Sequence, residues 1–141
     1  MFSFGKQSLN NLKDVDDLTR ELCDKALEES DIDFSVICGY RSKDEQAILY
    51  SEGKTELDGV NRISAHQLGF AIDVLPYTID SNGSRLDCWN YNNPKVKVAW
   101  AEVHRAFLRA ARLMNITLEL GVTYIMNDGS YDYPHIQIEG V

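Results

Sequence analysis

The chain has 141 residues, a length that fits a single domain spanning 1–141 and allows a substantial buried core. Hydrophobic residues make up 44% and charged residues 26%, as in ordinary globular proteins. The net charge of −8 argues against a nucleic-acid binder because phosphate contacts need clustered Lys or Arg, and no apolar run approaches the roughly 20 residues that span a bilayer.

The first third of the chain predicts two helices with a strand between them. Apolar residues recur every three or four positions from Leu9 to Leu27, which indicates one amphipathic helix. The β-branched and aromatic run 33–39 indicates a strand. Ser42 is followed three residues later by Glu45 in a capping-box pattern, so a second helix begins there and ends near Gly53.

The middle of the chain predicts one buried strand between two polar connections. The region 54–63 is polar and has no regular pattern, which indicates a loop. The apolar run 69–76 indicates a strand closed by proline. The polar stretch that follows contains Asn82-Gly83, a typical tight turn.

The last third predicts a long helix and two short strands. Pro94 suits the first position of a helix behind the capping candidate Asn93, and this helix should run to about Asn115. Its expected core face consists of Val96, Ala99, Trp100, Val103, Phe107, Ala110 and Leu113. The alternating runs TLELG and HIQIEG indicate strands, joined by a loop around NDGSYDYP. Helices and strands mix without regular βαβ alternation, which favours an α+β domain.

The cysteines and the N-terminus indicate the compartment in which the protein is made. The three cysteines, Cys23, Cys38 and Cys88, cannot all pair and show no CxxC spacing, so we predict buried free thiols. The N-terminus has no charged start followed by an apolar stretch, which predicts no signal peptide. We therefore expect synthesis in a cytoplasm.

The chain has only three histidines, and they occupy different kinds of position. His104 lies inside the predicted long helix, and we expect a helix-face residue without a catalytic role. His66 and His135 lie at the edges of predicted strands, beside loops, where a rigid scaffold can present ligands.

His66, Asp73 and His135 could together bind a catalytic zinc ion, which takes three protein ligands and leaves a fourth position for water. Each residue alone is more often structural. Asp73 is the exception, because it stands in an otherwise apolar strand and a buried carboxylate needs a partner charge or a metal.

Two further charged residues could take part in the chemistry. Asp132, three residues before His135, could accept a proton from an attacking water and pass it to a leaving amine, although taken alone it resembles a turn residue. Arg41 follows a predicted strand and could bind a carboxylate or oxyanion, although a surface salt bridge is its ordinary role.

Three blocks of the sequence resemble one enzyme family. The stretch SAHQLGFAID matches the S-x-H-x-x-G-x-A-x-D motif of the zinc D-Ala-D-Ala carboxypeptidase and L-alanyl-D-glutamate peptidase family. YDYPHIQI resembles the closing D-x-x-H motif of that family, and CGYRSKDEQ resembles its G-x-R-[ST]-x-x-x-Q segment. The blocks follow in the family's order over residues 34–138, and the short chain is most similar to the phage endolysin branch.

The resemblance implies a fold and a metal site. The fold would be a small α+β domain with an antiparallel sheet flanked by helices and a zinc site at the sheet, as in Hedgehog and D,D-peptidase domains. Zn²⁺ would be bound by His66, Asp73 and His135, with Asp132 acting first as general base and then as general acid.

The resemblance also implies residues that bind substrate. Arg41 would hold substrate or the oxyanion, Gln46 aligns with the glutamine of the family, and Ser64 would order the loop that carries His66. Gly69 would let the chain pass close to the metal shell. Endolysins of this branch cleave the L-alanyl-D-glutamate bond of peptidoglycan stem peptides.

One departure from the family keeps other functions open. Where the family commonly has G-x-D-W, this chain has Thr123 and Tyr124 at the last two places, so either Asp128 substitutes for the missing carboxylate or the activity is altered. The alternatives are a D-alanyl-D-alanine carboxypeptidase or dipeptidase, and an inactive zinc-stabilised module that binds cell-wall peptide.

The expected partners follow from the endolysin hypothesis. The substrate would be the peptidoglycan stem peptide, with no nucleic acid and no membrane span. A holin would give a protein made in the host cytoplasm access to the cell wall or periplasm, and we expect a monomer.

Overall fold

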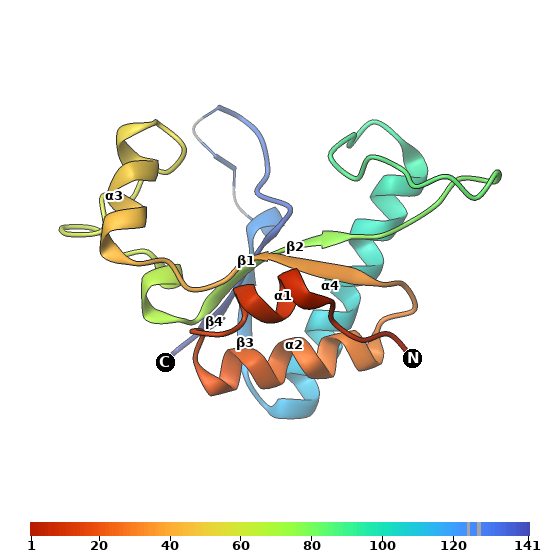
Figure 1. Ribbon diagram of the computed structural model, residues 1–141, viewed down its shortest axis with the longest axis horizontal. Coiled ribbons are helices and arrows are strands. Elements are labelled where there is room, and N and C mark those ends of the chain that lie inside the picture. Colours follow the sequence, from red (N-terminus) through yellow and green to blue (C-terminus); the bar gives the residue numbers. More distant parts are fainter. Residues whose placement is uncertain (124, 127) are drawn as a thin grey trace.

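One antiparallel sheet of four strands, in the order β1-β2-β4-β3, forms the centre of the computed structural model (Figure 1). The structure describes residues 1–123, 125–126 and 128–141. The elements are α1 (Lys6–Asn11), α2 (Asp17–Glu29), β1 (Phe34–Cys38), α3 (Lys43–Ser51), the 3₁₀ turn η1 (Ala65–Leu68), β2 (Ala71–Pro76), α4 (Pro94–Met114), β3 (Thr117–Leu120), the 3₁₀ turn η2 (Gly121–Thr123) and β4 (His135–Glu139). The predicted α+β class with an antiparallel sheet and helices is confirmed.

The pairing of the strands decides which side chains share a face of the sheet. Asp73 of β2 lies opposite His135 of β4 and opposite Cys38 of β1, where the β1–β2 pairing has an irregularity. Gln137 of β4 lies opposite Glu119 of β3. Because directly opposed residues point to the same face, these five polar or reactive side chains lie on one face of the sheet.

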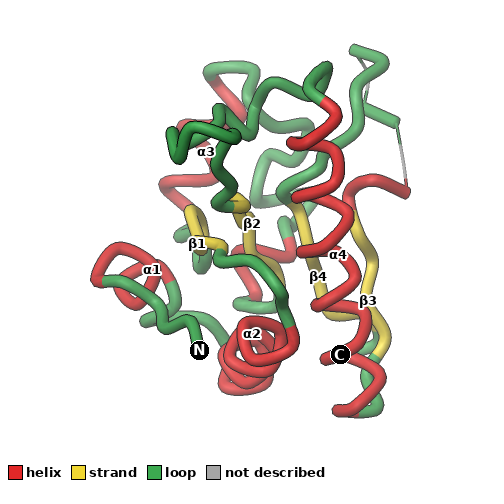
Figure 2. Tube along the Cα trace, turned by 90° about the vertical axis from the view of Figure 1, so that its right-hand side faces the viewer, coloured by secondary structure: helices red, strands yellow, loops and turns green. Residues whose placement is uncertain are grey.

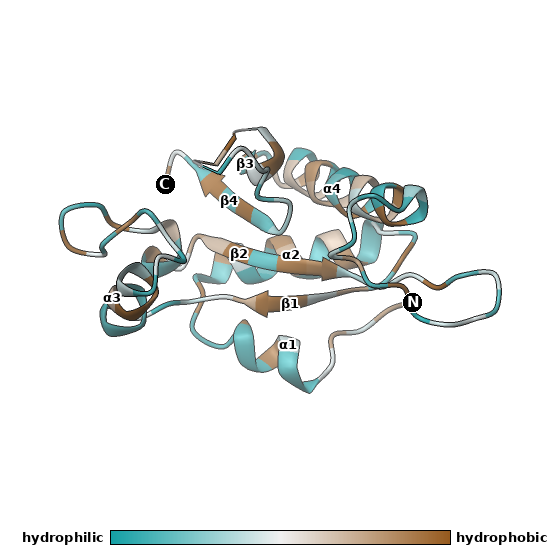
Figure 3. Cartoon of the chain, turned by 90° about the horizontal axis from the view of Figure 1, so that it is seen from above, coloured by the Kyte–Doolittle hydropathy of each residue, from teal (hydrophilic) through white to brown (hydrophobic). Residues whose placement is uncertain are grey.

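The other face of the sheet packs into the hydrophobic core. In β4 the buried Ile136 and Ile138 alternate with the partly exposed Gln137 and Glu139, and Figure 3 shows both hydrophobic and hydrophilic segments along this strand. The helices α2 and α4 pack against each other, and β3 lies beside α4 (Figure 2). The largest core side chains include Trp100 and Phe107 of α4.

The N-terminal region differs from the predicted single helix. The chain leaves the helix after α1 and starts again at α2, where the Asp16 side chain caps the new helix by accepting a hydrogen bond from Leu18 N at 2.9 Å. The break also ties this region to η1, since Asp16 N and Thr19 Oγ1 both donate to Gly69 O, at 3.0 and 2.7 Å. Asp16 caps α2 from within the continuous apolar pattern, so the chain forms two helices there.

The predicted role of Gly69 is wrong. Its backbone has φ = +78°, and a Cβ there would lie 2.9 Å from Asp16 N, so the close approach that requires glycine is to the start of α2 rather than to a metal shell.

The helix signals in the rest of the chain are confirmed with small changes. Ser42 and Glu45 form a capping box at the start of α3, and the Asn93 side chain caps α4 ahead of Pro94. The helix ends at Asn115, which adopts φ = +56°. Leu113 was expected in the core but is 47% exposed. Within the described residues, no helix has the length and hydrophobicity required to cross a membrane.

Candidate metal centre

A cleft of about 420 Å³ opens on the polar face of the sheet, where the ends of β2 and β4 meet the turn η1. Its described lining consists of Arg41, Lys54, Thr55, Glu56, Leu57, Ser64, Ala65, His66, Asp73, Met126, Asp132, His135 and Gln137. The cleft thus brings together six of the seven residues singled out from the sequence, and only Gln46 lies elsewhere.

His66 is held in η1 by hydrogen bonds on both sides of its ring. Ser64 caps the turn through a capping box with Gln67, which fixes the backbone around His66. The Nδ1–H of the imidazole donates to Gly39 O at 2.9 Å, so Nε2 is the nitrogen that faces the cleft. Nε2 lies 3.5 Å from Asp73 Oδ2.

Asp73 is the charged centre of the site. Its carboxylate contacts His66, His135 Nδ1 at 3.6 Å and Arg41 Nη2 at 3.7 Å. Burial raises the pKa of Asp73, but the contacts with the imidazoles of His135 and His66 outweigh burial and hold this pKa below its ordinary value. The carboxylate is therefore ionised at neutral pH and attracts a cation.

His66 holds a proton in the metal-free chain. Burial lowers the pKa of His66, but the hydrogen bond to the Asp73 carboxylate and the contact with Cys38 raise the pKa to about 9. At neutral pH the Nε2 proton therefore lies between His66 and Asp73, in the place where a metal ion would be bound.

The geometry fits a metal ion held by His66, Asp73 and His135. The two rings have centroids 5.2 Å apart, and each directs one nitrogen at a different oxygen of Asp73, at 3.5 and 3.6 Å. A tetrahedral zinc ion with bonds of about 2.0–2.1 Å holds its ligand atoms about 3.3 Å apart, so only small movements separate these nitrogens and oxygens from ligation.

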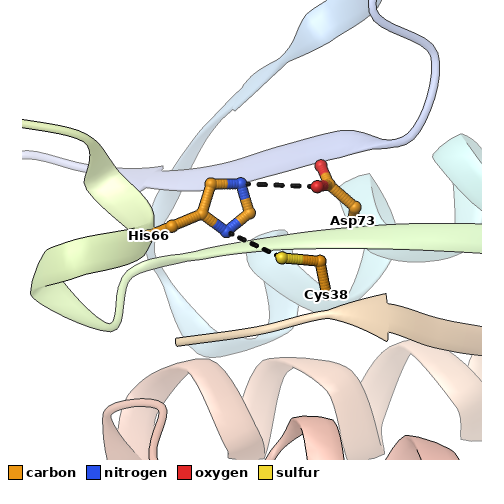
Figure 4. Close-up of side chains that lie close together, drawn as sticks. All are labelled: Cys38, His66 and Asp73. Atoms are coloured by element: carbon orange, nitrogen blue, oxygen red, sulfur yellow. Dashed lines mark hydrogen bonds and ion pairs between the residues drawn. The ribbon is translucent and has the colours of Figure 1, made fainter. Parts of the chain in front are cut away.

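Cys38 is a further candidate ligand that the sequence did not indicate. Cys38, His66 and Asp73 offer ligand atoms within 4.8 Å of one another (Figure 4). The Cys38 Sγ approaches Nδ1 of His66, at 3.9 Å, whereas Asp73 approaches Nε2. Since Nδ1 is also bonded to Gly39 O, an ion on the Nε2 side is the better match to the hydrogen bonds.

The three cysteines are free thiols, as predicted, but only Cys23 and Cys88 are buried. Partial burial raises the pKa of Cys38, but the hydrogen bond and charge of His66, together with the contact with Arg41, lower it by more, so the net shift is downward. The pairing of Cys38 with Asp73 across two strands is what places this thiol at the site.

Arg41 points into the site and is not a surface salt bridge. One guanidinium nitrogen donates to Gln46 Oε1 at 2.9 Å, and the other lies 3.7 Å from Asp73 Oδ2. The Arg41 backbone N–H donates to His66 O at 3.1 Å, which links the two residues through the main chain as well.

Gln46 lies behind Arg41, fully buried, rather than on the cleft wall. Its Nε2 donates to Leu57 O at 2.8 Å and to Thr55 Oγ1 at 3.2 Å, while its Oε1 accepts from Arg41. These bonds join α3 to the loop that forms one wall of the cleft, so Gln46 supports both Arg41 and that wall.

Asp132 lines the cleft from the loop before β4. Burial and the nearby Asp73 carboxylate raise the pKa of Asp132 above its ordinary value. Its backbone N–H donates to Gly121 O, and His135 N donates to Asp132 O at 3.3 Å, which fixes the loop against β4.

His104 lies outside the cleft, on α4, as predicted. Its Nε2–H donates to Tyr133 O at 2.9 Å, and its ring stacks with that of Tyr133. Tyr133 also stacks on Tyr91 with ring centroids 4.4 Å apart, so these aromatic contacts support the loop that carries Asp132.

Thr123 and Tyr124 stand where the family commonly has Asp-Trp, and Tyr124 lies outside the described residues. The Thr123 hydroxyl donates to Leu120 O at 2.7 Å. The Asp128 carboxylate accepts hydrogen bonds from the backbone and hydroxyl of Ser130, at 2.9 and 2.6 Å, and Asp128 does not belong to the described lining of the cleft.

Comparisons with known proteins agree with this arrangement. Residues 1–138 match the family model for phage L-alanyl-D-glutamate peptidase. The chain is 30% identical over 145 residues to the L-alanyl-D-glutamate peptidase of Escherichia phage T5, covering 97% of this chain and 98% of that protein. It also resembles the crystal structure of the Serratia marcescens L-Ala D-Glu endopeptidase ChiX, with a TM-score of 0.72 and 26% identity over 96% of this chain and 90% of that one. A match over nearly the whole sequence shows that the chain belongs to the phage L-alanyl-D-glutamate peptidase family.

Proposed function

We propose that this protein is a zinc-dependent endolysin that hydrolyses the L-alanyl-D-glutamate bond of peptidoglycan stem peptides. The observation that carries the proposal is the meeting of His66 Nε2 and His135 Nδ1 at the ionised Asp73 carboxylate, beside Asp132, in an open cleft. The family and both relatives described above bear names for the same bond.

Zinc is the metal that best suits two imidazoles and one carboxylate with room for water. When bound, zinc supplies Lewis acidity, which makes water a nucleophile near neutral pH and polarises the peptide carbonyl. Zinc would replace the proton that lies between His66 and Asp73 in the metal-free chain, so binding should release protons.

Asp132 would perform the proton transfers of the reaction. As a carboxylate it accepts a proton from the attacking water, and it then donates that proton to the departing D-glutamate nitrogen. Its raised pKa makes the protonated form easier to reach, which favours the second transfer.

Arg41 would bind a carboxylate of the substrate or the oxyanion that develops on the scissile carbonyl. Its guanidinium is already oriented by Gln46 and balanced by Asp73, so little ordering is needed when substrate arrives. Ser64 and Gln46 would act indirectly, through the His66 turn and the cleft wall.

The proposal extends to the setting in which the protein works. It would act as a monomeric single domain on the cell wall, with a holin-type partner giving access from the cytoplasm of the host. The polar cleft itself would supply the recognition of stem peptide.

Metal analysis beside a peptidase assay tests the proposal. We expect wild-type protein to hold one zinc ion per chain and Asp73→Asn to lose both zinc and peptidoglycan cleavage. Asp14→Asn makes the same chemical change at an exposed position and should alter neither. Cleavage that persists in Asp73→Asn, or in chelator-treated wild type, would contradict zinc dependence.

A further inference from the structure

Gln137 contacts the candidate ligand His135 on the open face of the sheet. Both side chains belong to β4 and lie two residues apart, so they point to the same side of the strand. The distance between Gln137 Oε1 and His135 Nε2 is 2.6 Å. Nε2 is the ring nitrogen on the side opposite to the Asp73 contact, which is made by Nδ1.

Two carboxylates fix the orientation of the Gln137 amide. Its Nε2 donates to Glu139 Oε1 at 2.8 Å and to Glu119 Oε2 at 3.3 Å. Ionised carboxylates only accept hydrogen bonds, so the amino group of the amide must face them. The amide oxygen is then the atom that faces His135, since a rotated amide would place its oxygen against two carboxylates.

The orientation of the amide determines the tautomer of the imidazole. An amide oxygen can only accept, so the neutral His135 ring must carry its proton on Nε2. Nδ1 is then left with its lone pair directed at the Asp73 side of the cleft, 3.6 Å from Oδ1. This is the form in which an imidazole ligates a metal through Nδ1.

The two candidate histidine ligands differ in what holds them. His66 donates its outer nitrogen to a main-chain carbonyl, Gly39 O, which substitution of a side chain does not remove. His135 depends on a side chain, Gln137, which is in turn held by Glu119 and Glu139. Side-chain substitutions can therefore test what orients His135, whereas they cannot remove the main-chain acceptor of His66.

We propose that Gln137, held by Glu119 and Glu139, is a positioning residue that fixes His135 in the tautomer required for metal ligation through Nδ1. The inference rests on the zinc site of the proposed function and adds three residues to its support. Gln137 acts through His135 and need not contact the reacting atoms.

The test uses a variant that removes the acceptor and a double variant that restores it. Gln137→Leu keeps the approximate size but offers no acceptor to His135. Glu119→Gln combined with Gln137→Glu exchanges the amide and the carboxylate, so net charge and an acceptor facing His135 are both retained. Gln7→Leu on the exposed face of α1 is the matched control.

Two readouts apply to each full-length variant. Long-range proton–nitrogen NMR of the metal-free protein reports which ring nitrogen of His135 is protonated. Competition with a chelator reports zinc affinity. We expect Gln137→Leu to shift His135 away from the Nε2–H form and to weaken zinc binding about 10- to 100-fold. The double variant should recover most of both losses, and Gln7→Leu should resemble wild type.

The outcomes separate this inference from the proposed function. An unchanged tautomer in Gln137→Leu, or a changed tautomer with unchanged zinc affinity, would overturn the role of Gln137. Wild-type protein that binds no zinc would instead overturn the zinc-dependent function, and the NMR comparison would still decide whether Gln137 orients the ring. The NMR signals of His104, which lies outside the cleft, report whether each variant is folded.

Discussion

At the residue scale, Asp73 gives the site an ionised carboxylate that would attract a cation. A buried carboxylate is costly unless charged or hydrogen-bonding partners surround it. His66, His135 and Arg41 supply these partners, and they do so from η1, β4 and the segment after β1. In the metal-free chain a proton on His66 balances this charge, and a metal ion can take its place.

The proton on His66 predicts how the stability of the metal-free protein depends on pH. The pKa of His66 is 6.5 in the unfolded chain and about 9 in the folded one, so the folded state binds more protons in this window. The stabilisation that His66 contributes should therefore be complete below about pH 6.5. It should be lost as the pH rises toward 9, which lowers the free energy of unfolding by at most about 3 kcal/mol.

Chemical denaturation at a series of pH values, in the presence of a chelator, measures this dependence. His66→Gln removes the titrating group, so its stability should decline less steeply than that of wild type over the same window. Parallel curves for the two proteins would show that His66 holds no extra proton in the folded state.

The role of Asp132 predicts that binding and catalysis can be separated. Asp132→Asn keeps the shape of the side chain but cannot accept a proton, so kcat should fall about 10²- to 10⁴-fold. Zinc content should stay at the wild-type level, because Asp132 is not one of the three candidate ligands. An active Asp132→Asn enzyme would mean that another group transfers the proton.

Sequence motifs indicate some site residues better than others. His66, Asp73 and His135 stand at recognisable spacings within one family pattern, so they could be singled out before the fold was known. Cys38 and Gln137 carry no such mark, because their places at the site depend on which strands pair and in what register. That pairing is a long-range property that local sequence does not encode.

At the element scale, the helix caps account for most of the successful predictions. Asn93 with Pro94, and Ser42 with Glu45, mark the starts of α4 and α3 by local hydrogen bonds that residue type alone predicts. The apolar period from Leu9 onward runs through the break between α1 and α2, so periodicity could not reveal it. The turn η1 was missed because four residues are too few for a periodic signal.

The contact between η1 and the start of α2 predicts a specific effect of substitution at Gly69. A Cβ at Gly69 would lie 2.9 Å from Asp16 N, in a backbone with φ = +78°, whereas Gly53 has φ = +72° and no heavy atom within 4 Å. Both alanine variants carry the cost of a left-handed backbone, about 1 kcal/mol, but only Gly69→Ala adds a clash.

Thermal denaturation and zinc titration of the two alanine variants test this contact. Gly69→Ala should lose more stability than Gly53→Ala, and it alone should weaken zinc binding, because the clash displaces the turn that carries His66. Equal losses in the two variants would show that the chain can adjust at Gly69 without moving η1.

At the scale of the whole molecule, the two faces of the sheet have separate tasks. One face packs with α2 and α4 into the core, and the other carries the cleft and its polar side chains. The α+β class was predictable from the mixture of helix and strand patterns. The strand order β1-β2-β4-β3 was not, because the sequence does not show which distant strands pair.

The measurement closest to the central claim is mass spectrometry of muropeptides after digestion with the zinc-loaded protein, beside Asp132→Asn as control. Cleavage of the L-alanyl-D-glutamate bond predicts fragments with a new D-glutamate amino terminus, which the control should not produce. Release of terminal D-alanine alone would identify a carboxypeptidase and contradict the proposed bond. Binding of muropeptides without any new fragment would contradict the claim that the protein hydrolyses them.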